Sequence, residues 1–116
     1  MDLARRDLRE ADLRGADLTG ARLAGADLRD AELDGAVLVD VDATDADLRR
    51  TRGFGIVATG LRAEGARLEG AEWREAKLDG AVLPGVRGAG ARLDRAALNG
   101  ATLRGASLER AVLDDA

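Results

Sequence analysis

A five-residue repeat runs through the whole chain without an insertion or a deletion. It is clearest between Ala11 and Asp40, where the sequence reads ADLRG ADLTG ARLAG ADLRD AELDG AVLVD. Leu fills 17 of the 23 third positions, and Ala fills 17 of the 24 first positions. The 15 glycines occupy fifth positions, except for Gly53 and Gly88, which occupy third positions. An unbroken short period is typical of a solenoid, so we expect residues 1–116 to form a single repeat domain.

This spacing fits neither a helix nor a continuous strand. In a helix, which turns about 100° per residue, five residues advance by about 140° net, so the leucines would spiral around the surface. In a strand, side chains alternate, so leucine would change face at every repeat. A short extended segment followed by a turn keeps every leucine on the inner side. Glycine in the fifth position predicts that turn, because glycine tolerates positive φ.

Repeats of this A(D/N)LxG type resemble those of the pentapeptide repeat family. The resemblance covers essentially all of the 116 residues. It implies an all-β fold, a right-handed quadrilateral parallel β-helix in which four pentapeptides form each coil, with about six coils in all. It also implies that the second, fourth and fifth positions face solvent, while the first and third positions point inward.

Residues 41–65 depart most from this consensus. Their third positions include the small residues Ala43, Gly53, Ala58 and Ala63. Their first positions hold the larger residues Val41, Thr51, Ile56 and Leu61. We expect the larger side chains to fill the space that the smaller ones leave, because protein cores are close-packed. Trp73, one coil above Gly53, is expected to lean over the missing side chain. Pro84 lacks an N–H and is expected to distort the backbone locally.

Charged side chains fill most outward positions, and residues 20 apart are expected to stack. One column would hold only acids, which repel each other: Asp7, Asp27 and Asp47. The neighbouring column would hold only bases and so neutralise it: Arg9, Arg29 and Arg49. Each exposed pair contributes well under about 1 kcal/mol, so the pattern favours solubility and register more than stability.

One side of the predicted coil is almost free of charge. It contains residues 16–20, 36–40 and 56–60, and it carries valines in outward positions. Solvation does not explain outward apolar side chains. We therefore take as the candidate interaction surface Val37, Val39, Phe54 and Val57. The alternative is that these are scattered and tolerated, since single exposed apolar residues are common.

The residue types exclude most catalytic chemistry. The chain has no His, Cys or Tyr, and its one serine is Ser107. The usual acid–base and nucleophilic constellations, which are built around these residues, are therefore excluded. The glycines at 55–60 and 85–90 lack the Lys-Ser/Thr ending and helix of a phosphate-binding loop. We predict no catalytic, cofactor or metal site, and no enzyme.

Two functions without catalysis follow. The first is a structural or protein-interaction module that presents a rigid surface to an unidentified protein partner; a homodimer and end-to-end association of copies both remain open. The second is implied by the family: a DNA mimic that binds DNA gyrase or topoisomerase and confers quinolone protection. Mimicry needs a strongly negative surface, whereas the net charge here is −4 and arginine columns interrupt the acids.

Other partners and locations are less favoured. Direct nucleic-acid binding is not expected, because no basic patch with stacking aromatic residues is present. No apolar run is long enough for a membrane span or a signal peptide. Met1 already lies in the frame of the repeat, so we expect no leader and a cytoplasmic location.

Overall fold

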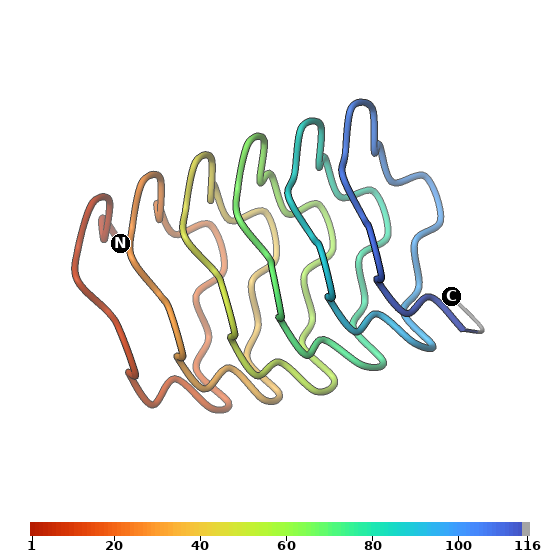
Figure 1. Cartoon of the computed structure of the whole chain (residues 1–116). Coiled ribbons are helices and arrows are strands. Elements are labelled where there is room, and N and C mark those ends of the chain that lie inside the picture. Colours follow the sequence, from red (N-terminus) through yellow and green to blue (C-terminus); the bar gives the residue numbers. More distant parts are fainter. Residues whose placement is uncertain (115–116) are drawn as a thin grey trace.

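The computed structural model describes residues 1–114, which wind as a solenoid of stacked coils (Figure 1). The first and the last of the described residues lie at opposite ends of the stack. The Cα atoms extend over 32 × 25 × 22 Å. The chain therefore has the β-solenoid architecture that the five-residue period predicts.

Each pentapeptide contributes a very short extended segment and a turn. The second-position residue pairs in parallel with the residue 20 positions later, from Asp2 with Arg22 to Arg92 with Val112. The fourth and fifth positions form the turn. Over residues 1–114 there is no helix, and no strand extends beyond these single bridges. A spacing of 20 residues corresponds to four pentapeptides.

Backbone hydrogen bonds join successive coils in a fixed pattern. The third-position N–H of Leu23 donates to Asp42 O over 2.7 Å, and the second-position N–H of Asp42 donates back to Ala21 O over 3.1 Å. The fifth-position N–H of Gly25 donates to Thr44 O over 2.9 Å. Three of the five N–H groups of such a repeat therefore bond a neighbouring coil.

The first-position N–H closes the turn. That of Ala26, for example, donates to Leu23 O over 2.9 Å. Every fifth position from Arg5 to Arg110 has a positive φ, as the third residue of a type II turn requires. Glycine suits this conformation, but nine turns place another residue there: Arg5, Glu10, Asp30, Asp40, Asp45, Arg50, Glu75, Arg95 and Arg110.

The fourth-position N–H is the one that the backbone leaves free, and an aspartate in the second position accepts it. Asp17 Oδ1 accepts from the Thr19 N–H over 3.1 Å. Asp42 Oδ1 accepts from the Thr44 N–H over 3.1 Å. Asp side chains commonly bond the backbone two residues on. This bond gives a physical reason for the frequent aspartate in the second position.

The expectation that Pro84 distorts the solenoid is wrong. Pro84 occupies a fourth position, where the N–H takes no part in the bonds between coils. The turn around it is intact, since the Val86 N–H donates to Leu83 O over 3.2 Å. Proline is also favoured at the second residue of a type II turn, which is the place that Pro84 takes.

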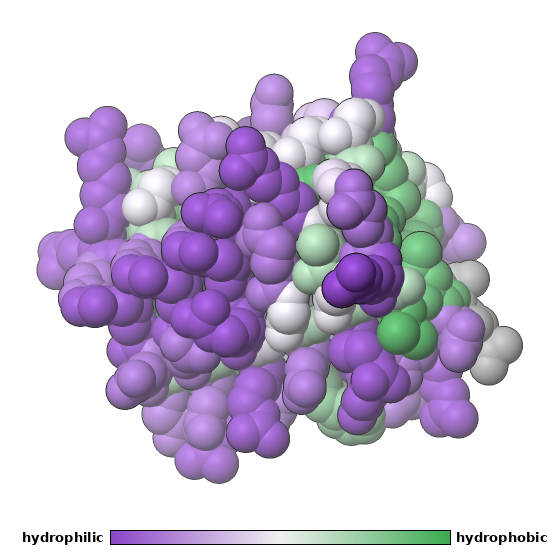
Figure 2. All heavy atoms as spheres, in the orientation of Figure 1, coloured by the Kyte–Doolittle hydropathy of each residue, from purple (hydrophilic) through white to green (hydrophobic). Residues whose placement is uncertain are grey.

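The core is a column of first- and third-position side chains. We expected larger first-position side chains to compensate for smaller third-position ones within residues 41–65, and this is confirmed. Val41, Ile56 and Leu61 are fully buried together with the small third-position residues. The column is less covered at its two ends, where Leu3 and Leu103 are half-buried and Leu113 is exposed. Figure 2 shows a mostly hydrophilic face with apolar atoms gathered toward the C-terminal end.

The expected fit between Trp73 and Gly53 is also confirmed. A Cβ atom at Gly53 would lie only 2.9 Å from Trp73 Cδ1, so the indole occupies the space of the missing side chain. Trp73 is fully buried, and its Nε1–H donates to Thr51 Oγ1 over 2.9 Å. The Thr51 hydroxyl in turn donates to Leu48 O over 2.9 Å. The sequence did not predict this role for Thr51.

Candidate interaction surface

The structure brings the three candidate valines together on one side of the solenoid. Val37 and Val57 form a parallel bridge, and the Leu38 N–H donates to Val57 O over 2.6 Å. Val39 lies two residues beyond Val37 in the same row. All three are half-buried, because stacked neighbours cover part of each side chain. Together they form an apolar strip whose side chains are only partly exposed to solvent.

Phe54 lies on the adjacent side, one turn before Val57. It is 56% exposed, whereas the leucines in the third positions of the middle coils are buried. Its N–H donates to Asp34 Oδ1 over 2.9 Å, which fixes the backbone below the ring. A shallow hollow around the ring is lined by charged residues, namely Asp34, Arg52, Glu72 and Arg74. Phe54 is thus an isolated aromatic ring surrounded by charges of both signs.

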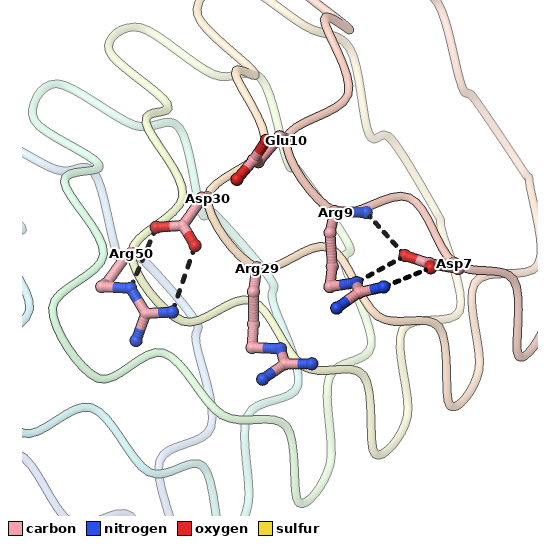
Figure 3. A pocket seen from close by; sticks show the side chains of 6 residues that line it. All are labelled: Asp7, Arg9, Glu10, Arg29, Asp30 and Arg50. Atoms are coloured by element: carbon pink, nitrogen blue, oxygen red, sulfur yellow. Dashed lines mark hydrogen bonds and ion pairs between the residues drawn. The ribbon is translucent and has the colours of Figure 1, made fainter.

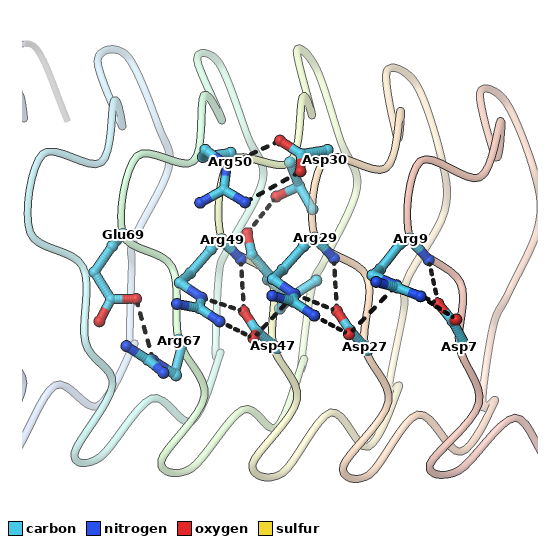
Figure 4. Close-up of polar contacts among 12 residues, drawn as sticks. Asp7, Arg9, Asp27, Arg29, Asp30, Asp47, Arg49, Arg50, Arg67 and Glu69 are labelled. Atoms are coloured by element: carbon cyan, nitrogen blue, oxygen red, sulfur yellow. Dashed lines mark hydrogen bonds and ion pairs between the residues drawn. The ribbon is translucent and has the colours of Figure 1, made fainter.

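The neutralised columns of acids and bases are confirmed and form what we call the Asp–Arg ladder (Figure 4). Its members are Asp7, Arg9, Asp27, Arg29, Asp47 and Arg49. Within a row, Arg29 Nε and Nη2 donate to the two carboxylate oxygens of Asp27 over 2.9 and 2.7 Å. Between rows, Arg29 Nε lies 3.6 Å from Asp47 Oδ2. Every carboxylate of the ladder is therefore neutralised by an arginine two residues on.

Hydrogen bonds set the acidity of these carboxylates. The Arg9 side chain, followed by the Arg9 backbone N–H, lowers the pKa of Asp7 to about 2. The Arg14 side chain and backbone do the same for Asp12, whose pKa is also lowered to about 2. At Asp47, burial acts to raise the pKa, but the bonds from Arg49 outweigh it and the pKa stays lowered. These groups remain charged well below neutral pH.

A shallow hollow beside the ladder holds three arginines and three acids (Figure 3). Arg9 pairs with Asp7, and Arg50 donates to both carboxylate oxygens of Asp30 over 2.9 and 3.1 Å. Arg29, also in the hollow, pairs with Asp27. All three guanidinium groups already have a carboxylate partner, so the hollow is poorly suited to an anionic ligand.

In the next coil the acid and the base exchange positions within the row. Arg67 takes the second position there and Glu69 the fourth, with Arg67 Nε 3.6 Å from Glu69 Oε2. On the adjacent side, Arg74 Nε and Arg92 Nε lie 3.4 and 3.5 Å from the carboxylate of Asp94. Along this part of the solenoid, acids and bases therefore alternate between the columns.

The acidic side chains are spread along the columns and do not cluster. Within residues 1–114, no group of three or more of them is arranged to hold a metal ion. No helix in this part of the chain is long and apolar enough to cross a membrane.

Comparison with known proteins agrees with this architecture. A family model described as pentapeptide repeats matches residues 2–35, 16–52 and 90–116 with 8 copies. A search of curated proteins found no match.

Two solved structures are similar over almost the whole chain. HetL, a pentapeptide repeat protein involved in heterocyst differentiation regulation from the cyanobacterium Nostoc sp. strain PCC 7120, is 33% identical, with a TM-score of 0.57. The match covers 98% of this chain and 62% of HetL, so the chain spans less than two thirds of that protein's length. A trypsin-treated variant of QnrB1, a plasmid-mediated fluoroquinolone resistance protein, is 20% identical with a TM-score of 0.64, over 100% of this chain and 77% of its own. The period, the solenoid and these matches together show that the chain belongs to the pentapeptide repeat family.

Proposed function

We propose that this protein is a non-catalytic interaction module that presents a rigid β-solenoid surface to a protein partner. The observation that carries the proposal is Phe54, a large aromatic side chain that is 56% exposed in the middle of the solenoid. Val37, Val39 and Val57 form a separate apolar strip on the adjacent side.

Rigidity and exposure together suit this role. The Phe54 backbone is held by the Asp34 carboxylate and by the Gly35 N–H, which donates to Phe54 O over 3.0 Å. Because its backbone is fixed, Phe54 loses only side-chain freedom when a partner covers the ring, and aromatic residues dominate the binding energy of many interfaces. The charged residues around the ring would form the polar rim of such an interface.

Affinity capture with matched variants tests this role. Wild-type protein, Phe54→Ala and a double variant, Val37→Lys with Val57→Lys, would each be used as bait in a native lysate. Val82→Ala is the control, because Val82 is an exposed valine on a different side. We expect specific partners to be lost from Phe54→Ala and from the double variant, and to be kept by the control. Equal capture by all four baits would contradict the proposal.

DNA mimicry directed at gyrase is the weaker alternative. The likeness to QnrB1 supports a shared fold, and the net charge is only −4. Asp7, Asp27 and Asp47, a column of acids, are each paired with an arginine two residues on and so present little unbalanced charge. A supercoiling assay decides: inhibition of gyrase, or protection from a quinolone, at sub-micromolar protein would place this alternative first.

We further propose that the solenoid is right-handed and four-sided, that it has about six coils, and that residues 1–116 form one domain. The bridges between residues 20 apart support four pentapeptides per coil. A crystal structure that showed left-handed winding or another number of sides would overturn this description.

A further inference from the structure

The side that carries the valines has a regular arrangement, and we call it the valine face. It consists of residues 16–20, 36–40, 56–60 and 76–80. Parallel bridges stack its second positions in one column, Asp17, Val37, Val57 and Lys77, and this column continues to Ala97 in the row that follows the face. Its fourth positions form the other outward column: Thr19, Val39, Thr59 and Asp79. Each row of the face therefore presents its second- and fourth-position side chains outward, and the row of Val37 also carries the exposed Asp40 in its turn.

The charges at the two ends of the valine face have no ionic partner within the described chain. Asp17 and Lys77 are both exposed. Among residues 1–114, no ion pair includes either of them or Asp79. The Asp–Arg ladder, which lies half a coil away on the opposite side, differs because each of its acids is paired. The valine face thus has an apolar centre, with the acid Asp17 in its first row and both Lys77 and Asp79 in its last row.

We propose that the valine face binds the valine face of a second copy, with the two solenoids antiparallel. This inference rests on the proposed interaction role and names one occupant of that surface. The two-fold axis would run along the strand direction, between the row of Val37 and the row of Val57. That rotation reverses the order of the rows and keeps each column opposite itself.

The face is complementary to itself in this arrangement. Asp17 lies opposite Lys77 of the second copy, and Val37 lies opposite Val57 of the second copy. In the other column, Val39 meets Thr59, and Thr19 meets the carboxylate of Asp79. Two-fold symmetry makes each contact twice, as in any isologous dimer. The valines exclude water at the centre, and opposite charges at both ends fix the register.

A parallel dimer satisfies the charges less well. Its two-fold axis would run along the solenoid, so each row would meet itself. Each Lys77 would then face Asp79 of the other copy, whereas the two Asp17 carboxylates would lie at the same level with no cation in their row, and like charges placed close together oppose association. The antiparallel arrangement instead sets each Asp17 opposite Lys77 of the other copy.

Solution mass tests whether the dimer forms. Sedimentation equilibrium or light scattering should give a mass that rises with concentration toward twice the 12.1 kDa of the chain. Val57→Lys should give only monomer, whereas Val82→Lys, a matched second-position valine on another side, should associate like the wild type. Monomer at all concentrations, or equal loss of association in both variants, would overturn the proposal.

Charge variants test the register. Lys77→Asp and Asp17→Lys should each weaken dimerisation by about tenfold, and the combined variant should restore it. Asp17→Asn removes the charge but keeps an acceptor for the Thr19 N–H, so its expected weakening reports on the charge and not on the turn. Circular dichroism of each variant checks that the monomer is folded. A combined variant no better than the single ones contradicts the antiparallel register.

The single lysine of the chain allows a direct test of orientation. A carbodiimide activates a carboxylate, which then forms an amide with a nearby amine; the water removed is taken up as a urea. In the covalent dimer of wild-type protein, mass spectrometry should find Lys77 joined to Asp17. Lys77 joined to Asp79 between copies would indicate the parallel dimer and overturn the proposal.

The two proposals fail in different ways. A purely monomeric protein whose partner capture still depends on Phe54 refutes the dimer and leaves the interaction role intact. A cross-linked antiparallel dimer whose capture is unaffected by Phe54→Ala refutes the role of Phe54 and leaves the dimer intact.

Discussion

The indole Nε1–H of Trp73 donates a hydrogen bond to Thr51 Oγ1 over 2.9 Å. The two residues are 22 positions apart in the sequence, and both are fully buried. The same ring fills the space above Gly53. One aromatic residue therefore joins two neighbouring coils by a polar contact and by packing. Each contact predicts a change in the free energy of unfolding when one of its partners is substituted.

Loss of the Thr51 hydroxyl should destabilise the protein. Thr51→Val keeps the shape of the side chain but leaves the buried indole N–H without an acceptor. An unsatisfied buried donor costs about 1–3 kcal/mol in the free energy of unfolding. Urea denaturation of the variant and of Thr51→Ser, which keeps the hydroxyl, measures the effect. If Thr51→Val and Thr51→Ser were equally stable, the hydrogen bond would contribute nothing.

Adding a methyl group at Gly53 should conflict with the indole. Gly53→Ala would place Cβ 2.9 Å from Trp73 Cδ1, and overpacking of this kind costs about 1–3 kcal/mol. In the Trp73→Leu background the same change should cost less, because the ring is gone. A double-mutant cycle measures this coupling, and additive effects would show that the two residues do not compete for space.

Glycine in place of a fifth-position residue should stabilise the solenoid. Glu75 has φ 57°, in the left-handed region that costs a non-glycine residue about 1–2 kcal/mol. Glu75→Gly should therefore raise the free energy of unfolding by about 0.5–1 kcal/mol, after the greater freedom of glycine in the unfolded chain is subtracted.

The next turn provides the opposite control. Gly80 has φ +68°, and a Cβ there would meet no atom within 4 Å. Gly80→Ala should thus be destabilising by about 1 kcal/mol through backbone conformation alone. Urea midpoints that moved in the same direction for Glu75→Gly and Gly80→Ala would contradict this account.

Acid should weaken the protein in a defined window. The pKa of Asp7 and of Asp12 is lowered from 3.8 to about 2 in the folded state. A lowered folded pKa means that the contribution to stability is present above the unfolded value and is lost as the pH falls through the folded one. We therefore expect the urea midpoint to be constant above about pH 5 and to fall between about pH 4 and pH 2.

The source of that pH dependence can be assigned by titration. In Arg9→Gln, the side chain of residue 9 no longer carries a charge, so NMR titration should show the pKa of Asp7 moving back toward 3.8. The return should be incomplete, because the residue 9 backbone N–H still donates to Asp7 Oδ1. An Asp7 pKa that did not respond to this substitution would rule out Arg9 as its main cause.

The sequence predicted the direction of nearly every side chain. A period of five, with leucine third and glycine fifth, determines which residues point inward and where the chain turns, because both depend on local backbone geometry. The pairing of Asp27 with Arg29 was predictable for the same reason: the two residues face outward in one row, two positions apart.

The tertiary structure decided what the period could not. The prediction from sequence that Pro84 distorts the backbone was wrong. Only the stacked coils show that the fourth-position N–H takes no part in the hydrogen bonds between them. Likewise, the hydrogen bond from Trp73 to Thr51 joins different coils and different positions of the repeat. A repeat determines the conformation of each unit, whereas contacts between units depend on how the side chains of successive coils pack against each other.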